Sequence, residues 1–110
     1  MPTIESLMSM LPGMFEADKA IGVDSIIQLN VTGLQTSHWT IEIKNGKLNV
    51  MKGIHTNPKL TIGADSNDLL DLANGKLEPG KAFTQGKLHV KGDVTEAAKL
   101  IQLFRVREHA

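Results

Sequence analysis

The first hydrophobic residues of the chain recur at the spacing of one helix face, i, i+3, i+4 and i+7: Ile4, Leu7, Met8 and Leu11. Thr3 stands immediately before them and can cap an amphipathic helix. Pro12 predicts the end of that helix, because proline lacks the N–H that the next helical hydrogen bond needs. Met14 and Phe15 continue the hydrophobic face, so we expect a second short helical piece after Pro12.

From residue 26 onward the pattern changes to strict alternation of hydrophobic and polar residues, which is typical of strands with one buried face. Alternation of this kind occupies five segments, 26–32, 39–44, 47–50, 60–62 and 87–91. Asn45-Gly46, between the second and third segments, favours a type I′ hairpin turn. Because every strand has one polar face, we expect an α+β fold with a mainly antiparallel five-stranded sheet covered by helices on one face.

Helical spacing returns in two short segments between the last two strands. Asp65 or Ser66 can cap a helix that carries several leucines, and Gly75 can end it in the left-handed conformation. Pro79 can begin another short helix, which would extend through Phe83.

The last helix is hydrophobic over more than half of its circumference. It opens with Asp93-x-x-Glu96, a variant of the capping box. Its hydrophobic residues are Val94, Ala97, Ala98, Leu100, Ile101, Leu103 and Phe104. Contact with one sheet covers a narrower stripe than this, so we expect the second side of the helix to be buried against something else.

Charge and composition exclude several classes of protein. The chain has 12 Lys and Arg against 12 Asp and Glu in 110 residues, so a basic surface for nucleic acid is not expected. No segment approaches the roughly 18 apolar residues of a transmembrane span. Cysteine is absent, which excludes thiol chemistry and weakly favours a reducing compartment. We expect one cytoplasmic domain, residues 1–110, and residues 107–110 match neither a peroxisomal nor an endoplasmic-reticulum signal.

The segment GKLEPGK, residues 75–81, has the spacing of a phosphate-binding P-loop. A P-loop joins a buried strand to a helix, whereas this segment follows the helical pattern DLLDLAN. Ala82 also stands where Ser or Thr would hold magnesium. The sequence therefore predicts a helix end followed by a turn that Pro79 begins, and no nucleotide site.

The same region carries a more specific pattern. NGKLEPGKAFTQGKLHVKGDVTEAAKLIQLF, residues 74–104, resembles the C-terminal signature of the sterol carrier protein 2 family. GVDSIIQLNVTG at 22–33, WTIEIKNGK at 39–47 and PKLTIGADSNDLLDLANGKL at 58–77 resemble the same family in order and spacing. The resemblance covers nearly the whole chain. Thr84 departs from the pattern, since an apolar residue is common there in the family.

The resemblance implies a sheet covered on one face by helices, with a hydrophobic tunnel between them for fatty acids, acyl-CoA or sterols. It also implies binding and transfer of lipid without catalysis or cofactor, with transient contact to a membrane or a lipid-metabolising enzyme. Flexible apolar side chains suit such a site. We predict these lipid-binding residues: Met8, Leu11, Met14, Phe15, Trp39, Met51, Leu69, Leu72, Phe83, Leu100, Leu103 and Phe104. A charged headgroup would stay outside, where it could meet Lys76, Lys81, Lys87 or Lys91.

Two other functions remain open at this stage. A small cavity enzyme, such as an isomerase, would need an acid or base in the tunnel, and Asp65 and Asp68 are the nearest candidates. A protein-interaction module would present lipid to a partner enzyme or form a dimer through an exposed apolar helix. The histidines, at 38, 55, 89 and 109, lack the spacing of metal ligands, so no metal site is expected.

Overall fold

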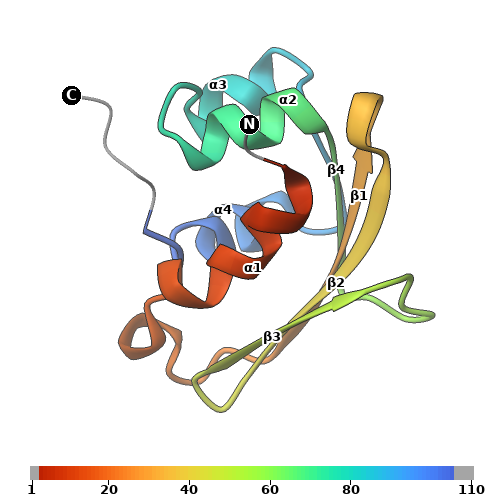
Figure 1. Ribbon diagram of the computed structural model, residues 1–110. Coiled ribbons are helices and arrows are strands. Elements are labelled where there is room, and N and C mark those ends of the chain that lie inside the picture. The colour runs from red at the N-terminus through yellow and green to blue at the C-terminus, as the bar shows by residue number, and fades with distance from the viewer. Residues whose placement is uncertain (1–2, 106–110) are drawn as a thin grey trace.

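Helices cover one face of a five-stranded sheet in the computed structural model, which describes residues 3–105 (Figure 1). The C-terminal residues 107–110, including His109, lie outside the described residues. The elements in chain order are α1 (Ile4–Met14), η1 (Ala17–Ala20), β1 (Ser25–Thr32), η2 (Gly33–Gln35), β2 (Ser37–Lys44), β3 (Lys47–Lys52), β4 (Leu60–Asp65), α2 (Ser66–Ala73), α3 (Pro79–Thr84), β5 (Leu88–Lys91) and α4 (Val94–Ile101).

The strands lie in the order β3-β2-β1-β4-β5. β1 is parallel to β4, and the other three neighbouring pairs are antiparallel. In this register Ile27 on β1 lies between Ile41 on β2 and Leu60 on β4. The prediction of an α+β fold with a mainly antiparallel sheet is confirmed.

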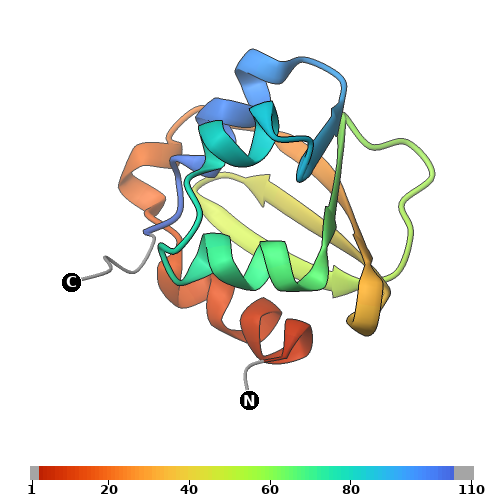
Figure 2. The same ribbon diagram turned by 90° about the horizontal axis from the view of Figure 1, so that it is seen from above.

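The two faces of the sheet differ because hydrophobic and polar residues alternate along each strand. The helices wrap over the inner face, as the view from above also shows (Figure 2). Val31 and Ile43 are completely buried on that face. On the outer face, Gln28 is buried beneath the segment that follows β3, and its Oε1 accepts a hydrogen bond of 2.7 Å from the His55 N–H. The hydrophobic core therefore lies between the inner face and the helices.

The predicted break at Pro12 is wrong, because α1 continues to Met14. Thr3 caps the helix as predicted, and its Oγ1 accepts a hydrogen bond of 3.0 Å from the Ser6 N–H. Pro12 removes one backbone donor from the last turns, but the Phe15 N–H still bonds the Leu11 carbonyl at 3.0 Å. Pro12 itself is exposed.

The predicted turn residues adopt the conformations that their positions require. Asn45 and Gly46 have φ of 54° and 71°, which confirms the type I′ hairpin turn between β2 and β3. Gly75 has φ of 76° after the end of α2. Asp65 caps the start of α2, where its Oδ1 accepts a hydrogen bond of 2.8 Å from the Asn67 N–H.

α4 begins at the predicted position but ends earlier than predicted. The Asp93 side chain accepts a hydrogen bond of 2.9 Å from the Thr95 N–H, whereas the Glu96 carboxylate pairs with Lys59 at 3.1 Å. The helix stops at Ile101, and Phe104 forms an antiparallel bridge with Phe15 instead. The residues after α4 therefore pair with the segment after α1 and do not continue the helix.

Candidate binding cavity

An apolar cavity of about 140 Å³ lies between the inner face of the sheet and the helices. Sixteen residues line it, and all of them are apolar. The sheet supplies Ile27, Leu29, Ile41, Ile62 and Leu88, while α1 supplies Leu7, Met8, Leu11 and Met14. The remaining lining residues come from α2, α3, α4 and the residues after α4: Leu69, Leu72, Ala73, Pro79, Leu100, Ile101 and Phe104.

The periodicity of each element explains why these side chains converge. Leu7, Leu11 and Met14 recur at i, i+4 and i+7, which places them on one face of α1. Ile27 and Leu29 are two residues apart on β1, so both point toward the helices. The same patterns that predict helices and strands therefore also build the walls of the cavity.

Burial divides the lining into a closed part and an open part. The lining residues from the sheet are buried, as are Leu7, Met8 and Leu11 of α1 and Leu100 of α4. We call the half-buried lining residues the opening; they are Met14, Leu69, Leu72, Ala73, Pro79, Ile101 and Phe104. The opening thus lies along α2 and at the C-terminal ends of α1 and α4.

α2 is seated more loosely than α1, which packs beside it on the cavity. Its only buried residue is Ser66, and its leucines and Ala73 are all half-buried. By contrast, α1 buries Ile4, Leu7, Met8 and Leu11. Because burial of apolar side chains is what holds a short helix on a domain, α2 can move away from the cavity at a lower cost than α1 can.

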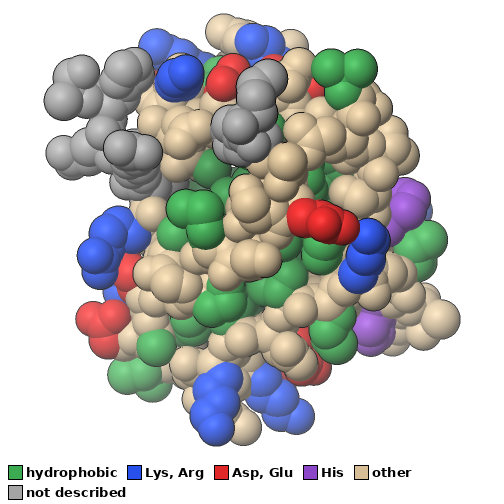
Figure 3. Space-filling view, viewed as in Figure 1, with side chains coloured by type: hydrophobic (Ala, Val, Ile, Leu, Met, Phe, Trp, Pro, Cys, Tyr) green, Lys and Arg blue, Asp and Glu red, His purple; other side chains and the backbone are tan. Residues whose placement is uncertain are grey.

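Charged side chains lie around the helical face, whose middle exposes hydrophobic side chains (Figure 3). Beside the opening, Glu16 pairs with Lys19 at 2.7 Å and with Arg105 at 3.5 Å. The hydrogen bond from Lys19 and the nearby positive charges lower the pKa of Glu16, and the same hydrogen bond raises the pKa of Lys19. This cluster connects the segment after α1 to the segment after α4.

The structure places seven of the twelve predicted lipid-binding residues around the cavity: Met8, Leu11, Met14, Leu69, Leu72, Leu100 and Phe104. Their contact with lipid stays a prediction. Of the hydrophobic surface predicted for the last helix, Leu100 and Ile101 face the cavity, whereas Val94 and Ala98 are exposed, so burial of its second side is only partial.

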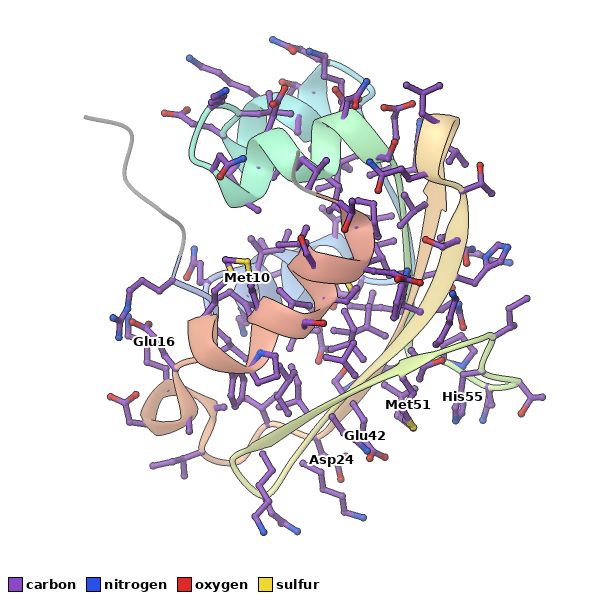
Figure 4. The ribbon with its side chains drawn as sticks, in the orientation of Figure 1. Met10, Glu16, Asp24, Glu42, Met51 and His55 are labelled. Atoms are coloured by element: carbon purple, nitrogen blue, oxygen red, sulfur yellow. The ribbon has the colours of Figure 1, made fainter. Side chains whose placement is uncertain are left out.

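Phe83 and Met51 do not line the cavity. Phe83 on α3 is 42% exposed, because only Ala82 of that helix is buried. Met51 lies opposite Thr40 in the pairing of β2 with β3, so it belongs to the outer face. Figure 4 shows Met51 on the side of the sheet away from the helices. Alternation counted from Leu48 and Val50 would have placed Met51 on this outer face.

Trp39, Phe15 and Leu103 are buried or half-buried near the cavity without lining it. Trp39 faces inward, but Lys52 lies 5.7 Å from its ring and its Nε1 donates a 2.8 Å hydrogen bond to Ser37. Phe15 packs against Phe104, with ring centroids 5.7 Å apart. Leu103 lies beyond the end of α4, where its carbonyl accepts a hydrogen bond of 2.8 Å from Glu16. The hydrophobic side chains of these three residues pack in or against the core of the domain.

The predicted site lacks all five cavity residues that the sheet supplies, Ile27, Leu29, Ile41, Ile62 and Leu88. Each of them is a hydrophobic residue in one of the alternating segments, so the sequence did contain a signal for them. Leu7, Ala73, Pro79 and Ile101 were missed as well.

Of the four lysines predicted to meet a headgroup, only Lys76 lies next to the opening, in the turn between Ala73 and Pro79. Lys81 is 3.9 Å from Glu78 on the exposed side of α3. Lys87 and Lys91 alternate with Leu88 and so belong to the outer face of the sheet.

The polar residues considered for catalysis or metal binding lie outside the cavity. Neither Asp65 nor Asp68 lines it. His38 Nδ1 lies 2.8 Å from the Asn30 side chain, and His55 Nδ1 accepts a hydrogen bond from Asn57. Within residues 3–105, no three His, Cys, Asp or Glu side chains gather as a metal site would require.

Thr84 also lies outside the cavity. It is exposed at the end of α3, where its hydroxyl donates to the carbonyls of Gly80 and Lys81. The departure from the family pattern at this position therefore leaves the polarity of the cavity wall unchanged.

The sequence profile of the SCP-2 sterol transfer family matches residues 15–105. The peroxisomal multifunctional enzyme A of Dictyostelium discoideum is 35% identical over 85 residues, which are 76% of this chain and 19% of that protein. Sterol carrier protein 2 of Bos taurus is 38% identical over 71 residues, which are 64% of this chain and 13% of that protein. The chain therefore spans a fifth or less of the length of these relatives.

Solved structures agree with this match. The solution structure of palmitated SCP2L2 from Aedes aegypti has a TM-score of 0.78 and 25% sequence identity, and the alignment covers 99% of this chain and 100% of that one. In the described part of the chain, residues 3–105, no helix has the length and hydrophobicity to cross a membrane.

Proposed function

The chain belongs to the SCP-2 sterol transfer family, a family of lipid-binding and lipid-transfer domains, and we propose that it binds the hydrocarbon part of a lipid in the cavity and carries it between environments. The observation that carries this proposal is the wholly apolar lining of the cavity. Fatty acids, fatty acyl-CoA and sterols are the ligand classes, and the palmitated mosquito relative supports the first of these.

The energetics suit a carrier. Burying a hydrocarbon chain yields about 0.8 kcal/mol per methylene group, whether the chain enters a protein or a bilayer. Because both environments hide the chain from water, the exchange between them is nearly balanced. Binding in the cavity would therefore protect a lipid from water without trapping it.

The cavity must widen to take a long chain. A dry cavity of about 150 Å³ lined by Leu, Ile and Phe binds a molecule the size of benzene, and the cavity here has about 140 Å³. Two features allow widening: α2 is loosely seated, and the walls include Met8 and Met14, whose unbranched side chains adapt to different shapes.

We propose that the domain acts without catalysis. An acid or base in the cavity would be needed for isomerisation. Neither candidate, Asp65 nor Asp68, lines the cavity, and Asp65 caps α2 instead. The apolar lining among the described residues supports the binding function over the enzymatic one.

Presentation of the bound lipid to an enzyme is a second candidate function. The relatives include a peroxisomal multifunctional enzyme and hydroxysteroid dehydrogenase-like protein 2 of Xenopus tropicalis, and this chain matches 19% of each. In such proteins a domain like this one is joined to other parts of a longer chain. This arrangement favours a role in which lipid passes from the cavity to an enzyme.

Native mass spectrometry tests the binding function. Protein incubated with palmitate is expected to gain the mass of one palmitate per chain. Leu100→Asp places a charge in the closed part of the cavity and should abolish the gain, because a carboxylate there would lose its hydration. Val94→Asp is the matched control on the same helix, since Val94 is 44% exposed and outside the cavity. Absence of any complex with palmitate, palmitoyl-CoA or cholesterol in the unaltered protein would refute the proposal.

A further inference from the structure

The cavity is lined by apolar residues throughout, but polar residues border its opening and none lines its floor. From this asymmetry we infer that the cavity takes its ligand tail first, with the polar end held at the opening, and that it selects lipids that are polar at one end only. This inference rests on the proposed function and adds a ligand class and an orientation to it.

The closed part of the cavity offers no partner to a polar group. Its floor consists of Ile27, Leu29, Ile41, Ile62 and Leu88. The backbone N–H and C=O groups of most floor residues are also unavailable to a ligand, because β1, β2 and β4 are each hydrogen-bonded to a neighbouring strand on both sides. A buried water would need two to four polar partners, which this lining does not provide. A hydroxyl or carboxylate at the floor would therefore remain without hydrogen bonds.

The opening, by contrast, is bordered by polar groups. The turn between Ala73 and Pro79 joins two residues of the opening and contains Asn74, Lys76 and Glu78. Arg105 follows Phe104 directly on the other side and is exposed. Both positive and negative groups are present, so the opening suits a polar end without requiring one sign of charge.

The energetic consequence is a measurable selectivity. An unsatisfied buried hydroxyl costs roughly 1–3 kcal/mol, and a hydrophobic pocket rejects an added hydroxyl by a factor on the order of 100. If the tail enters first, a hydroxyl on the last carbon of the chain lies against the floor. If the carboxylate entered first, the same hydroxyl would lie in water at the opening and would cost nothing.

Palmitate and 16-hydroxypalmitate are the matched probes, because they differ by one oxygen atom at the far end of the chain. Titration calorimetry on the unaltered protein should give a dissociation constant about 10 to 100 times larger for 16-hydroxypalmitate. Hexadecanedioate, with a carboxylate at each end, should bind more weakly still. Affinities of palmitate and 16-hydroxypalmitate within threefold would overturn the inference and leave lipid binding intact. Failure of palmitate itself to bind would refute the proposed function and the inference together.

A pair of variants tests whether the floor causes the selectivity. Ile62→Thr keeps a β-branched residue in β4 and adds a hydroxyl to the floor, so it should reduce the ratio of the two dissociation constants several-fold. Ala73→Ser adds a hydroxyl at the opening and should leave that ratio unchanged. Equal ratios in a folded Ile62→Thr and in Ala73→Ser would contradict the inference. If Ile62→Thr does not fold, Ile41→Thr makes the same change on β2.

Discussion

Phe15 and Phe104 form an antiparallel bridge with ring centroids 5.7 Å apart and ring planes tilted by 52°. Two backbone hydrogen bonds flank the bridge, from the Glu16 N–H to the Leu103 carbonyl at 2.8 Å and from the Arg105 N–H to the Met14 carbonyl at 2.7 Å. Phe104 also lines the cavity. The bridge to Phe15 therefore holds Phe104 in place at one border of the opening.

Removal of the Phe104 ring is expected to affect stability and binding together. Phe104→Ala should lower the free energy of unfolding by about 2–3 kcal/mol, less than for a fully buried ring because Phe104 is half-buried. Palmitate binding should weaken as well, since the variant loses part of the cavity wall. Urea denaturation and calorimetry measure the two effects. Phe83→Ala is the control, and a loss of palmitate affinity in that variant equal to the loss in Phe104→Ala would contradict the placement of the cavity.

Filling the cavity should abolish lipid binding without unfolding the protein. Leu69 is a half-buried cavity residue on the loosely seated α2, so Leu69→Trp can place an indole in the space that the lipid would occupy. We expect at least a tenfold loss of palmitate affinity. Met10→Trp is the matched control on α1, because Met10 is 59% exposed and points away from the sheet (Figure 4). Unchanged affinity in Leu69→Trp would show that the ligand binds elsewhere.

The hairpin turn gives a stability prediction that is independent of function. Gly46 has φ of 71°, and an L-residue in that conformation costs about 1–2 kcal/mol. Gly46→Ala should therefore lower the free energy of unfolding by that amount. Gly13→Ala should raise it by up to about 1 kcal/mol, because Gly13 lies in α1 and an added Cβ meets nothing within 4 Å. Equal effects of the two substitutions in urea denaturation would be inconsistent with these backbone conformations.

The cluster beside the opening predicts a pH dependence. The pKa of Glu16 is lowered in the folded protein, mainly by the hydrogen bond from Lys19, so folding favours the ionised carboxylate. Its contribution is present above the ordinary glutamate pKa of about 4.3 and is lost as the pH falls through the lowered value. Glu16→Gln should therefore be slightly less stable than the unaltered protein at neutral pH, and the difference should vanish in acid.

Lys19 sets the other limit of that pH range. Its raised pKa means that its contribution is complete below the ordinary lysine value and declines only as the pH rises through the raised value. Denaturant midpoints measured from acid to neutral pH provide the test. A stability difference between Glu16→Gln and the unaltered protein that grew toward acid pH would show that the pair does not act as described.

The sequence predicted the helices and strands more completely than it predicted the residues that line the cavity. Alternation identified every strand, and Asn45-Gly46 identified the hairpin, because these signals depend on local backbone geometry. Helical spacing also showed that the last helix has more hydrophobic surface than a sheet contact needs. Which residues face the cavity is a tertiary property. Phe83 and Phe104 look equivalent in the sequence, but α3 buries only Ala82, whereas the bridge to Phe15 holds Phe104 at the opening.

The central claim is that lipid occupies the cavity between sheet and helices, and methyl NMR spectra recorded during a palmitate titration test it most directly. Saturating palmitate should shift the methyl signals of Leu11, Ile41 and Leu100, which line the cavity. The methyl signals of Ile21, Leu34 and Ile54 should stay in place, because these residues are exposed and lie outside it. Shifts confined to the exposed residues, or no shifts at all, would contradict the claim.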